Sequence, residues 1–315
     1  MGRMKTSGIH HVTGITGDAQ KNIDFYTGPL GLRMIKLTVN FDDPSAYHLY
    51  YGNALGEPGT IATFFHWPGM RERLTGAGEI TAVAFSIPPT AANYWESRLK
   101  EHGIPCDRRV VFGEDHLIFR DPDGLQVELV ADKTLPAIAP WTHSVPDACA
   151  IRSFHSVTLC EDGSEKTRRF LVGTFGYTKV AEEDTVYKYS TEGKAAGRHL
   201  YVRVAPDMPQ GVMGKGTVHH VAFRAKDDAD EESIRTELLA AGMDATPVID
   251  RNYFYSVYFR EPGGILFEIA TDGPGFTINE SAENLGSSLV LPAQYEPHRS
   301  QIEAMLPKVT LPKYD

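Results

Sequence analysis

Cysteine is scarce in this chain of 315 residues, which has only Cys106, Cys149 and Cys160 and no Cys-x-x-Cys spacing. An odd, scattered set of three thiols argues against a thiolate metal site and for a reducing compartment, so we expect a cytoplasmic protein. Long apolar runs are also missing. None approaches the roughly 20 residues that span a bilayer, and the first residues lack the apolar stretch of a signal peptide. The sequence therefore predicts no membrane partner.

Positive charge is in deficit as well, since 31 Lys and Arg face 41 Asp and Glu and give a formal net charge of −10. No block of basic residues stands out along the chain. A nucleic-acid-binding protein normally carries a basic patch, so this balance predicts no nucleic-acid partner. Hydrophobic residues make up 42% of the chain, which is enough for a substantial core.

Four segments repeat one plan at intervals of roughly 70 residues: a strand, a helix, and further strands that end in a turn and a last strand. The first strands read GIHHVTGIT, EITAVAFSI, FHSVTLC and TVHHVAFRA. The helices are predicted at residues 19–26, 91–102, 163–174 and 227–241. The pattern indicates an α+β protein built from four βαβββ modules.

A proline-containing segment without periodicity, residues 136–152, separates the second module from the third and is predicted to be a linker. The predicted domains are therefore 1–135 and 153–272, each with two modules, followed by a C-terminal extension at 273–315. One short helix is expected after Pro297, with Ile302, Met305 and Leu306 on its apolar side. The extension either packs on the body, caps a cavity, or is a loosely held terminus.

The stretch VYFREPGGILFE, residues 257–268, reads as strand, turn and strand and ends in a carboxylate inside an apolar run, Glu268. Burying a carboxylate requires a cation, a proton or a polar partner. A Glu facing outward from a half-exposed strand is the alternative. The second and fourth modules end alike, in RDPDGLQVELVAD and REPGGILFEIATD, so Gly124 matches Gly264 and Glu128 matches Glu268.

Each module offers one inward position on its first strand and one on its last strand where a side chain could meet a metal ion. The first-strand positions are His11, Ala82, His155 and His220, and the last-strand positions are Thr63, Glu128, Tyr201 and Glu268. One module cannot close a cavity alone, so two must pair. Pairing the first with the fourth gathers His11, His220 and Glu268, whereas pairing the third with the fourth puts His155 in place of His11. The residues alone leave both pairings open.

Either pairing gives two imidazoles and one carboxylate, a facial triad that leaves coordination positions free and suits Fe(II) with oxygen substrates. Because Ala82 is no ligand, the remaining modules predict a relic site around Glu128. Strand alternation lets only one histidine of each adjacent pair face the cavity. His11 shares its face with Thr13, and His220 shares its face with Ala222. We therefore expect His10 and His219 to lie behind the ligand histidines and not to bind the metal themselves.

At this point the chain resembles a known family. The fourfold plan, with FYTGPLGLR and DPDGLQVEL, resembles the vicinal oxygen chelate superfamily of glyoxalases, bleomycin-resistance proteins and extradiol dioxygenases, over about residues 8 to 271. The resemblance implies two tandem glyoxalase/extradiol-dioxygenase-like domains. VYFREPGGILFE also resembles the extradiol dioxygenase signature, which Tyr258, Glu261, Pro262, Gly264 and Glu268 match. The signature carries a histidine where this chain has Arg251.

The histidine doublets, Arg251 and the tail YEPHRSQIEAMLP are similar to the hydroquinone-cleaving branch of that superfamily. This resemblance implies Fe(II), with Mn(II) as the other choice, bound by His11, His220 and Glu268. It implies that the residues lying behind the ligands or contacting substrate are His10, Thr13, His219, Arg251 and Tyr258. The expected function is a ring-cleaving dioxygenase of aromatic catabolism that opens a hydroquinone-type or catechol-type ring, with a small aromatic diol and O2 as partners. A homo-oligomer is compatible with it.

Two other functions fit the same fold. A glyoxalase-like isomerase or thiol transferase would favour Zn or Ni and a fourth protein ligand, for which Thr63 is poorly suited. A non-catalytic protein that binds aromatic drugs would be expected to lose the ligands. At the level of single residues, Arg251 could instead pair with Asp250 or Glu261, and Tyr258 could simply fill core.

Overall fold

The computed structural model describes residues 6–163 and 165–314. The predicted boundaries at residues 1 and 315 lie outside these residues. The first module comprises β1 (Ile9–Thr16), α1 (Ala19–Thr27), β2 (Arg33–Val39), β3 (Tyr47–Gly52) and β4 (Ile61–His66). The second comprises β5 (Glu79–Ile87), α2 (Ala92–Glu101), β6 (Asp107–Val111), β7 (Glu114–Arg120) and β8 (Gln126–Ala131).

The third module comprises β9 (Ser153–Glu161), α3 (Glu165–Gly173), β10 (Thr178–Glu183), β11 (Val186–Ser190) and β12 (His199–Val204). The fourth comprises β13 (Val218–Ala225), α4 (Asp228–Ala240), β14 (Ile249–Asp250), β15 (Phe254–Arg260) and β16 (Leu266–Pro274). The C-terminal extension holds η1 (Phe276–Ile278), η2 (Ala282–Asn284), η3 (Glu296–His298) and α5 (Arg299–Met305). The predicted α+β class with four βαβββ modules is confirmed.

Local chemistry explains where these elements begin and turn. The Asp18 side chain accepts a hydrogen bond from the backbone N–H of Lys21 and so caps α1. Gly124 and Gly264, at the matching turns before β8 and β16, have φ of +83° and +96°, which glycine adopts without strain. Within residues 6–163 and 165–314, every helix is too short or too polar to cross a lipid bilayer.

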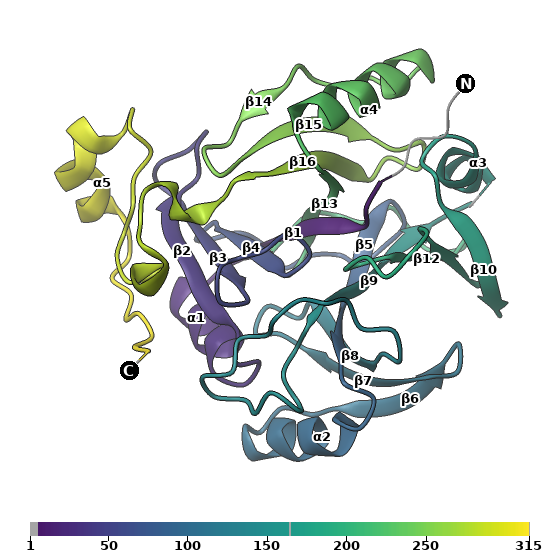
Figure 1. Ribbon diagram of the computed structural model, residues 1–315, viewed down its shortest axis with the longest axis horizontal. Coiled ribbons are helices and arrows are strands. Elements are labelled where there is room, and N and C mark those ends of the chain that lie inside the picture. Colours follow the sequence, from purple (N-terminus) through teal and green to yellow (C-terminus); the bar gives the residue numbers. More distant parts are fainter. Residues whose placement is uncertain (1–5, 164, 315) are drawn as a thin grey trace.

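Strand pairing decides which modules share a cavity. β1 pairs antiparallel with β13, and β5 pairs antiparallel with β9, so the first module joins the fourth and the second joins the third (Figure 1). The strands run in the order β10-β11-β12-β9-β5-β13-β1-β4-β3-β2, with β16 branching from β13 and β8 from β5. The alternative pairing of the third module with the fourth is wrong. Because each pairing joins the two halves of the sequence, the predicted boundaries at 135, 153 and 272 stay predictions.

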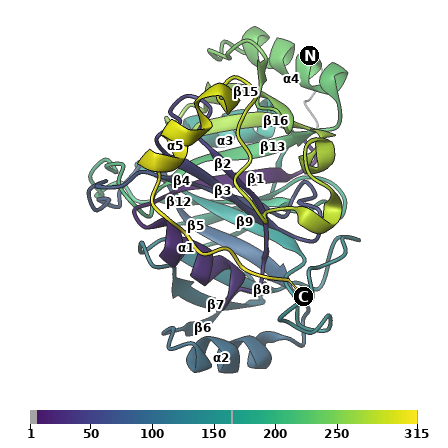
Figure 2. The same cartoon turned by 90° about the vertical axis from the view of Figure 1, so that its left-hand side faces the viewer.

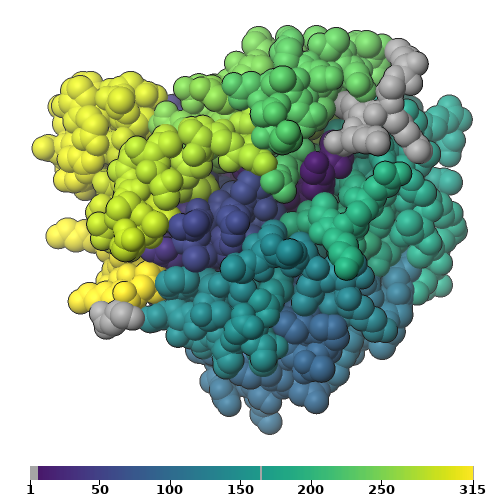
Figure 3. Space-filling model, viewed as in Figure 1, coloured from purple at the N-terminus to yellow at the C-terminus, as the bar shows by residue number. Residues whose placement is uncertain are grey.

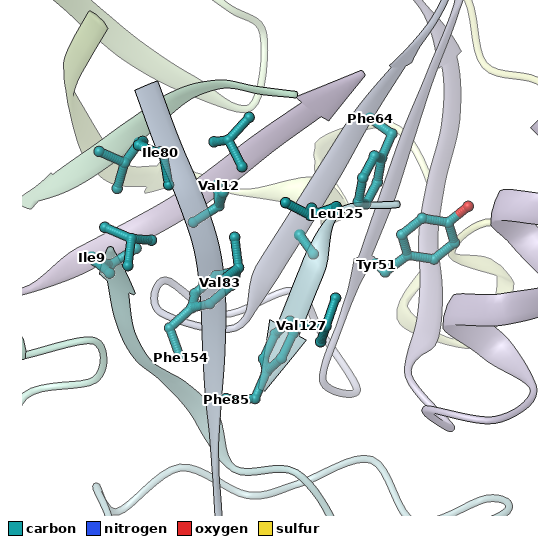
Figure 4. Packing of buried hydrophobic residues seen from close by; sticks show 14 of the residues in the cluster. Ile9, Val12, Tyr51, Phe64, Ile80, Val83, Phe85, Leu125, Val127 and Phe154 are labelled. Atoms are coloured by element: carbon teal, nitrogen blue, oxygen red, sulfur yellow. The ribbon is translucent and has the colours of Figure 1, made fainter. Parts of the chain in front are cut away.

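The main core lies where β1, β5, β8 and β9 meet. Val12, Val83, Phe85, Val127 and Phe154 are all at most 4% exposed, and their side chains fill the space between these strands (Figure 4). Full burial of such a side chain contributes about 1.5–3 kcal/mol. Because Val12 points into this core, strand alternation turns its neighbours on β1 toward the opposite face.

The predicted linker and the C-terminal extension both pack on the body. The segment between β8 and β9 has no helix or strand, but the Trp95 indole N–H donates to the Cys149 carbonyl at 2.7 Å and anchors it. The extension runs along the first module (Figures 2 and 3), where the Val290 N–H donates to the Leu37 carbonyl at 2.9 Å. For the described residues, the prediction of a loosely held terminus is therefore wrong.

The same extension reaches a loop of the first module, residues 40–43. The Tyr295 hydroxyl donates to the Phe41 carbonyl at 2.7 Å and braces this loop from outside. Ile302 in α5 and Leu306, which caps its C-terminus, are buried as expected. Met305 is 59% exposed, so its predicted place on the apolar side is wrong, because the buried face of this short helix consists of Ile302.

A buried carboxyl group in the third module makes stability depend on pH. Glu161 is 1% exposed, lies against Gly263, and has one oxygen without a hydrogen-bond partner. Burial, with Glu261 and Asp162 nearby, raises its pKa from 4.5 to about 8. The folded chain therefore binds more protons here than the unfolded chain, and this stabilisation is lost as pH rises from about 4.5 to about 8.

We expect Glu161→Gln, which keeps the shape and removes the charge, to flatten the fall of stability over this pH range. Urea midpoints measured at intervals from about pH 5 to about pH 8.5 would show it. Glu192→Gln, at an exposed position, is the matched control and should leave the profile unchanged. An equally steep profile in Glu161→Gln would contradict the argument.

Candidate metal centre

Three buried side chains from three strands converge in the cavity between the first and fourth modules. They are His11 on β1, His220 on β13 and Glu268 on β16, and each is at most 4% exposed. Glu268 Oε2 lies 2.9 Å from His220 Nε2 and 3.3 Å from His11 Nε2, and the two Nε2 atoms are 3.3 Å apart. The strand ladders bring them together, since Thr13 lies opposite His220 and Ala222 opposite Glu268.

The spacing of these three atoms suits one ion. Ligand atoms in neighbouring positions on an ion with bonds of about 2.1 Å lie about 3 Å apart. Glu268 Oε1 accepts a hydrogen bond from the Ser256 hydroxyl at 2.5 Å, whereas the buried Oε2 atom has no hydrogen-bond partner in the part of the chain that the structure describes. Two imidazoles and a carboxylate are also the donor set that non-haem iron takes in a facial triad. The residues therefore fit a divalent metal ion.

The protonation states agree with that fit. Burial alone would raise the pKa of Glu268, but the rings of His11 and His220 outweigh burial and hold the pKa well below its usual value. Glu268 is therefore a carboxylate. Burial also lowers the pKa of His220, despite the nearby Glu268, and a neutral ring has a lone pair to offer a metal.

The second histidine of each doublet lies behind its neighbour. His10 Nδ1 is 2.9 Å from His11 Nδ1, and His219 Nδ1 is 2.8 Å from His220 Nδ1. Burial lowers the pKa of His10, and that of His219 to about 3, so neither is charged near neutral pH. If Nε2 of a ligand histidine holds a metal, its proton sits on Nδ1, and the neighbour accepts that proton's hydrogen bond. The His10 ring is hydrogen-bonded in turn to the backbone of Thr271.

We expect His10→Phe to weaken divalent-metal affinity by about 10- to 100-fold, because the His11 ring loses the partner that fixes its tautomer and orientation. Competition with a metal chelator would measure the change. His10→Asn keeps an acceptor oxygen and should lose less affinity. His102→Phe, at an exposed position beyond α2, is the control. Unchanged affinity in His10→Phe would show that the doublet does not orient its ligand.

A cavity of about 500 Å³ is lined by His11 and His220, two of the three candidate ligands. Its apolar wall consists of Phe41, Phe65, Trp67, Phe254 and Leu266. The other lining side chains are His11, Thr13, Asn40, Asp42, Asp43, His48, Tyr50, His219, His220, Arg251 and Tyr258. Aromatic walls around a few polar groups suit a small ring-shaped ligand. His10 is buried but does not line the cavity.

Arg251 and Tyr258 reach the cavity as a bonded pair. Arg251 Nε donates to the Tyr258 hydroxyl at 3.2 Å, and Nη1 lies 3.3 Å from Asp42. The alternative ion pairs of Arg251 with Asp250 or Glu261 are not formed, because the side chain turns inward across to the loop at 40–43. Burial raises the pKa of Tyr258, so its hydroxyl stays protonated and can donate into the cavity.

Sequence reasoning missed a hydrogen-bonded chain on β3 and β4. His48 Nε2 lies 2.7 Å from the Thr63 hydroxyl, and His48 Nδ1 lies 2.9 Å from the Tyr50 hydroxyl. Thr63 is in turn 3.1 Å from the Thr13 hydroxyl. The alternation in YHLYYG puts His48 and Tyr50 on one face, which was a usable signal. The last-strand position of the first module thus carries a hydroxyl already engaged by two neighbours.

The expected equivalence of His155 with His11 is wrong by one residue. Thr13 lies opposite Thr63 in the β1–β4 ladder, and Thr158 lies opposite Tyr201 in the β9–β12 ladder. The residue two places before Thr158 is Ser156, so His155 corresponds to His10. A shift of one residue moves a side chain to the other face of its strand.

The relic site expected around Glu128 also needs correction. Glu128 Oε2 pairs with His116 Nδ1 at 2.7 Å, and Gln126 donates to its other oxygen. Among residues 6–163 and 165–314, the second group with metal-ligand chemistry is Glu114, His155 and His199, which excludes Glu128. The reason is that Ala82 and Ser156 occupy the two positions where an imidazole would have to face Glu128.

Comparison with known proteins agrees with the fold. The family model "Glyoxalase/Bleomycin resistance protein/Dioxygenase superfamily" matches residues 8–129 and 153–269. The chain is 46% identical over 301 residues, 95% of each sequence, to "Putative ring-cleaving dioxygenase MhqO" of Bacillus subtilis. It is 34% identical over 302 residues, 93% of each, to "Chlorohydroquinone/hydroquinone 1,2-dioxygenase" of Sphingobium indicum. A solved structure described as a putative dioxygenase from Bacillus subtilis superposes with a TM-score of 0.94 at 44% identity, covering 98% of this chain and 99% of that one.

Proposed function

The chain belongs to the glyoxalase/bleomycin resistance protein/dioxygenase superfamily, and we propose that it is a ring-cleaving dioxygenase that opens a hydroquinone-type ring with O2. His11, His220 and Glu268 would hold one Fe(II). The names of its relatives support ring cleavage, and one of them names hydroquinone. The aromatic cavity over the triad supports a small aromatic diol as substrate.

One observation carries the choice of an oxygenase over an isomerase. The fourth position that could supply a ligand is Thr63, and its hydroxyl is held between His48 and Thr13. His11, His220 and Glu268 would thus be three ligands, and an ion that they hold would keep coordination positions free. Substrate and O2 need such free positions. A glyoxalase-like isomerase or thiol transferase would be expected to use a fourth protein ligand at this place.

The ligand set also favours an anionic substrate. Fe(II) at this site would supply Lewis acidity that favours the phenolate form of a bound phenol and a path for electrons from the ring to O2. Glu268 neutralises one of the two positive charges, and coordinating imidazoles are neutral. One positive charge is left to attract a phenolate.

The residues around the triad can handle protons and the charge that develops on oxygen. When His219 accepts from His220 at Nδ1, its own proton sits on Nε2, where it can be donated into the cavity. Arg251 adds a permanent cation with planar donors, and Tyr258 adds a hydroxyl. We propose that these groups and Thr13 orient the ring hydroxyl and O2 and stabilise oxyanions as the ring opens.

A hydroquinone can offer only one hydroxyl to the triad, so its second hydroxyl must find partners across the ring. Asn40, Asp42 and Asp43 line the same cavity and are the candidates, on the loop that Tyr295 braces. A catechol would instead place both hydroxyls at the triad. The ratio of activity on the two diols therefore reports how the ring is held.

The test is oxygen uptake by protein purified anaerobically and loaded with Fe(II), Mn(II), Zn(II) or Ni(II) in turn. We expect uptake with hydroquinone, higher than with catechol, in the Fe(II) sample. Glutathione-dependent isomerisation in the Zn(II) or Ni(II) sample would favour the isomerase instead. Tight binding of aromatic diols without any turnover would favour a non-catalytic binding protein.

A further inference from the structure

A second set of two imidazoles and one carboxylate lies between the second and third modules. The set is Glu114 at the start of β7, His155 on β9 and His199 on β12, whose ligand-type atoms all lie within 4.8 Å of one another. His155 is 1% exposed and His199 is 7% exposed. The donor chemistry equals that of the first cavity, although the atoms are further apart.

This set is not a copy of the first triad. In the first module His11 lies opposite Ile61, whereas in the third module Ser156 lies opposite His199. His199 therefore takes the place of Ile61, the buried apolar residue opposite His11, just as His155 takes that of His10. The histidines of the second set therefore occupy other positions in their module than the ligands of the first triad do. The function of this set has to be inferred from its own contacts.

A buried lysine already forms an ion pair with the carboxylate of this set. Lys188 on β11 is 7% exposed, and its Nζ lies 2.5 Å from Glu114 Oε2. Lys188 lies opposite Tyr201, as Tyr50 lies opposite Thr63 in the first cavity, so a cation stands where the first cavity has a phenol. Burial would raise the pKa of Glu114, but His155 and Lys188 outweigh it and hold the pKa below its usual value.

Both imidazoles keep an unused nitrogen in the interior. Among residues 6–163 and 165–314, the buried His155 Nε2 and His199 Nε2 have no hydrogen-bond partner, while each Nδ1 is held by a serine hydroxyl. His155 Nε2 lies 3.6 Å from Glu114 Oε2. An unpaired buried nitrogen is costly, and native structures carry few of them. Two that face one carboxylate are a ready pair of metal ligands.

We propose that Glu114, His155 and His199 form a latent divalent-metal site that Lys188 keeps free of metal. The Lys188 ammonium takes the carboxylate oxygen that an ion would need and would repel an ion held beside it. Without that ammonium the half-buried Glu114 carboxylate loses its cation, and the two free Nε2 atoms complete a site for an imidazole-preferring ion such as Co(II) or Zn(II). The lysine thereby confines metal binding to the first cavity.

The test counts Co(II) bound per full-length chain after gel filtration of the wild type and of Lys188→Met. We expect Lys188→Met to bind one more Co(II) than the wild type, and Lys188→Met with His199→Phe to lose that extra ion. Lys188→Arg keeps a cation and should bind no more than the wild type. Lys188→Gln, which keeps polarity but not charge, gives the same test if the methionine variant fails to fold.

Two results would overturn the proposal. One is no extra Co(II) in folded Lys188→Met and Lys188→Gln proteins. The other is a wild-type protein that already loses one Co(II) on His199→Phe, which would show that the lysine does not exclude the ion. The readout is the difference in bound Co(II) between the wild type and the Lys188 variants. This difference does not depend on which metal binds at His11, His220 and Glu268.

Discussion

Glu268→Gln is expected to abolish ring cleavage, lowering turnover by about a thousandfold or more, because it removes the only charged ligand of the proposed iron site. The substitution keeps the side-chain shape at a position that is 0% exposed, so the fold should survive. Metal affinity should fall with turnover, since two neutral imidazoles and an amide no longer offset the charge of the ion. Metal content and oxygen uptake, measured on the same preparation, would separate lost metal from lost chemistry.

The chain offers a matched control for this variant. Glu128 occupies the equivalent place on β8, where Ala84 lies opposite it as Ala222 lies opposite Glu268. Glu128→Gln should leave metal content and oxygen uptake close to those of the wild type. If Glu128→Gln loses activity and Glu268→Gln keeps it, the working site lies between the second and third modules and the proposed ligands are wrong.

Arg251→Met is expected to lower kcat/KM by about 100- to 1000-fold with metal content unchanged, the range seen when one donor to a developing oxyanion is removed. Arg251 lines the cavity and contacts Tyr258, not the three ligand side chains. Its role should therefore appear in turnover rather than in metal binding. Arg251→Lys keeps the charge but loses the planar donors, so only part of the activity should return.

The control for this variant is Arg260→Met, at the exposed end of β15, where the side chain donates to the Gly264 carbonyl. Asp42→Asn tests whether Arg251 acts only by fixing the loop at 40–43 through its ion pair with Asp42, which we call the latch role. A loss in Asp42→Asn as large as in Arg251→Met would support the latch. A loss of bound metal in Arg251→Met would show that the arginine acts on the ligands.

Much of the fold could be predicted because its signals are local. Helix periodicity, the glycines at 124 and 264, and the repeated strand patterns each depend on a few neighbouring residues. The histidine doublets and Glu268 stood out because charged and polar side chains in apolar strands need partners. Which modules pair could not be settled from the residues, since the β1–β13 ladder joins segments more than 200 residues apart.

The errors have a shared physical origin. His155 was placed one residue out of register, and a period of two in strands turns that small error into a side chain on the wrong face. Two ion pairs could not be predicted, that of Arg251 with Asp42 and that of Glu114 with Lys188. Each joins segments that are far apart in the sequence and meet only in the folded chain. His48 was overlooked because its role comes from Thr63 on the neighbouring strand, not from its own sequence context.

The most direct test is ring cleavage of hydroquinone by the Fe(II)-loaded protein under ¹⁸O2, with the product analysed by mass spectrometry. We predict a ring-opened product that carries both atoms of one O2 molecule, formed by the wild type and absent with His11→Ala. Oxidation of hydroquinone to quinone without incorporated oxygen would contradict the account. So would full activity in His11→Ala that disappears in His155→Ala.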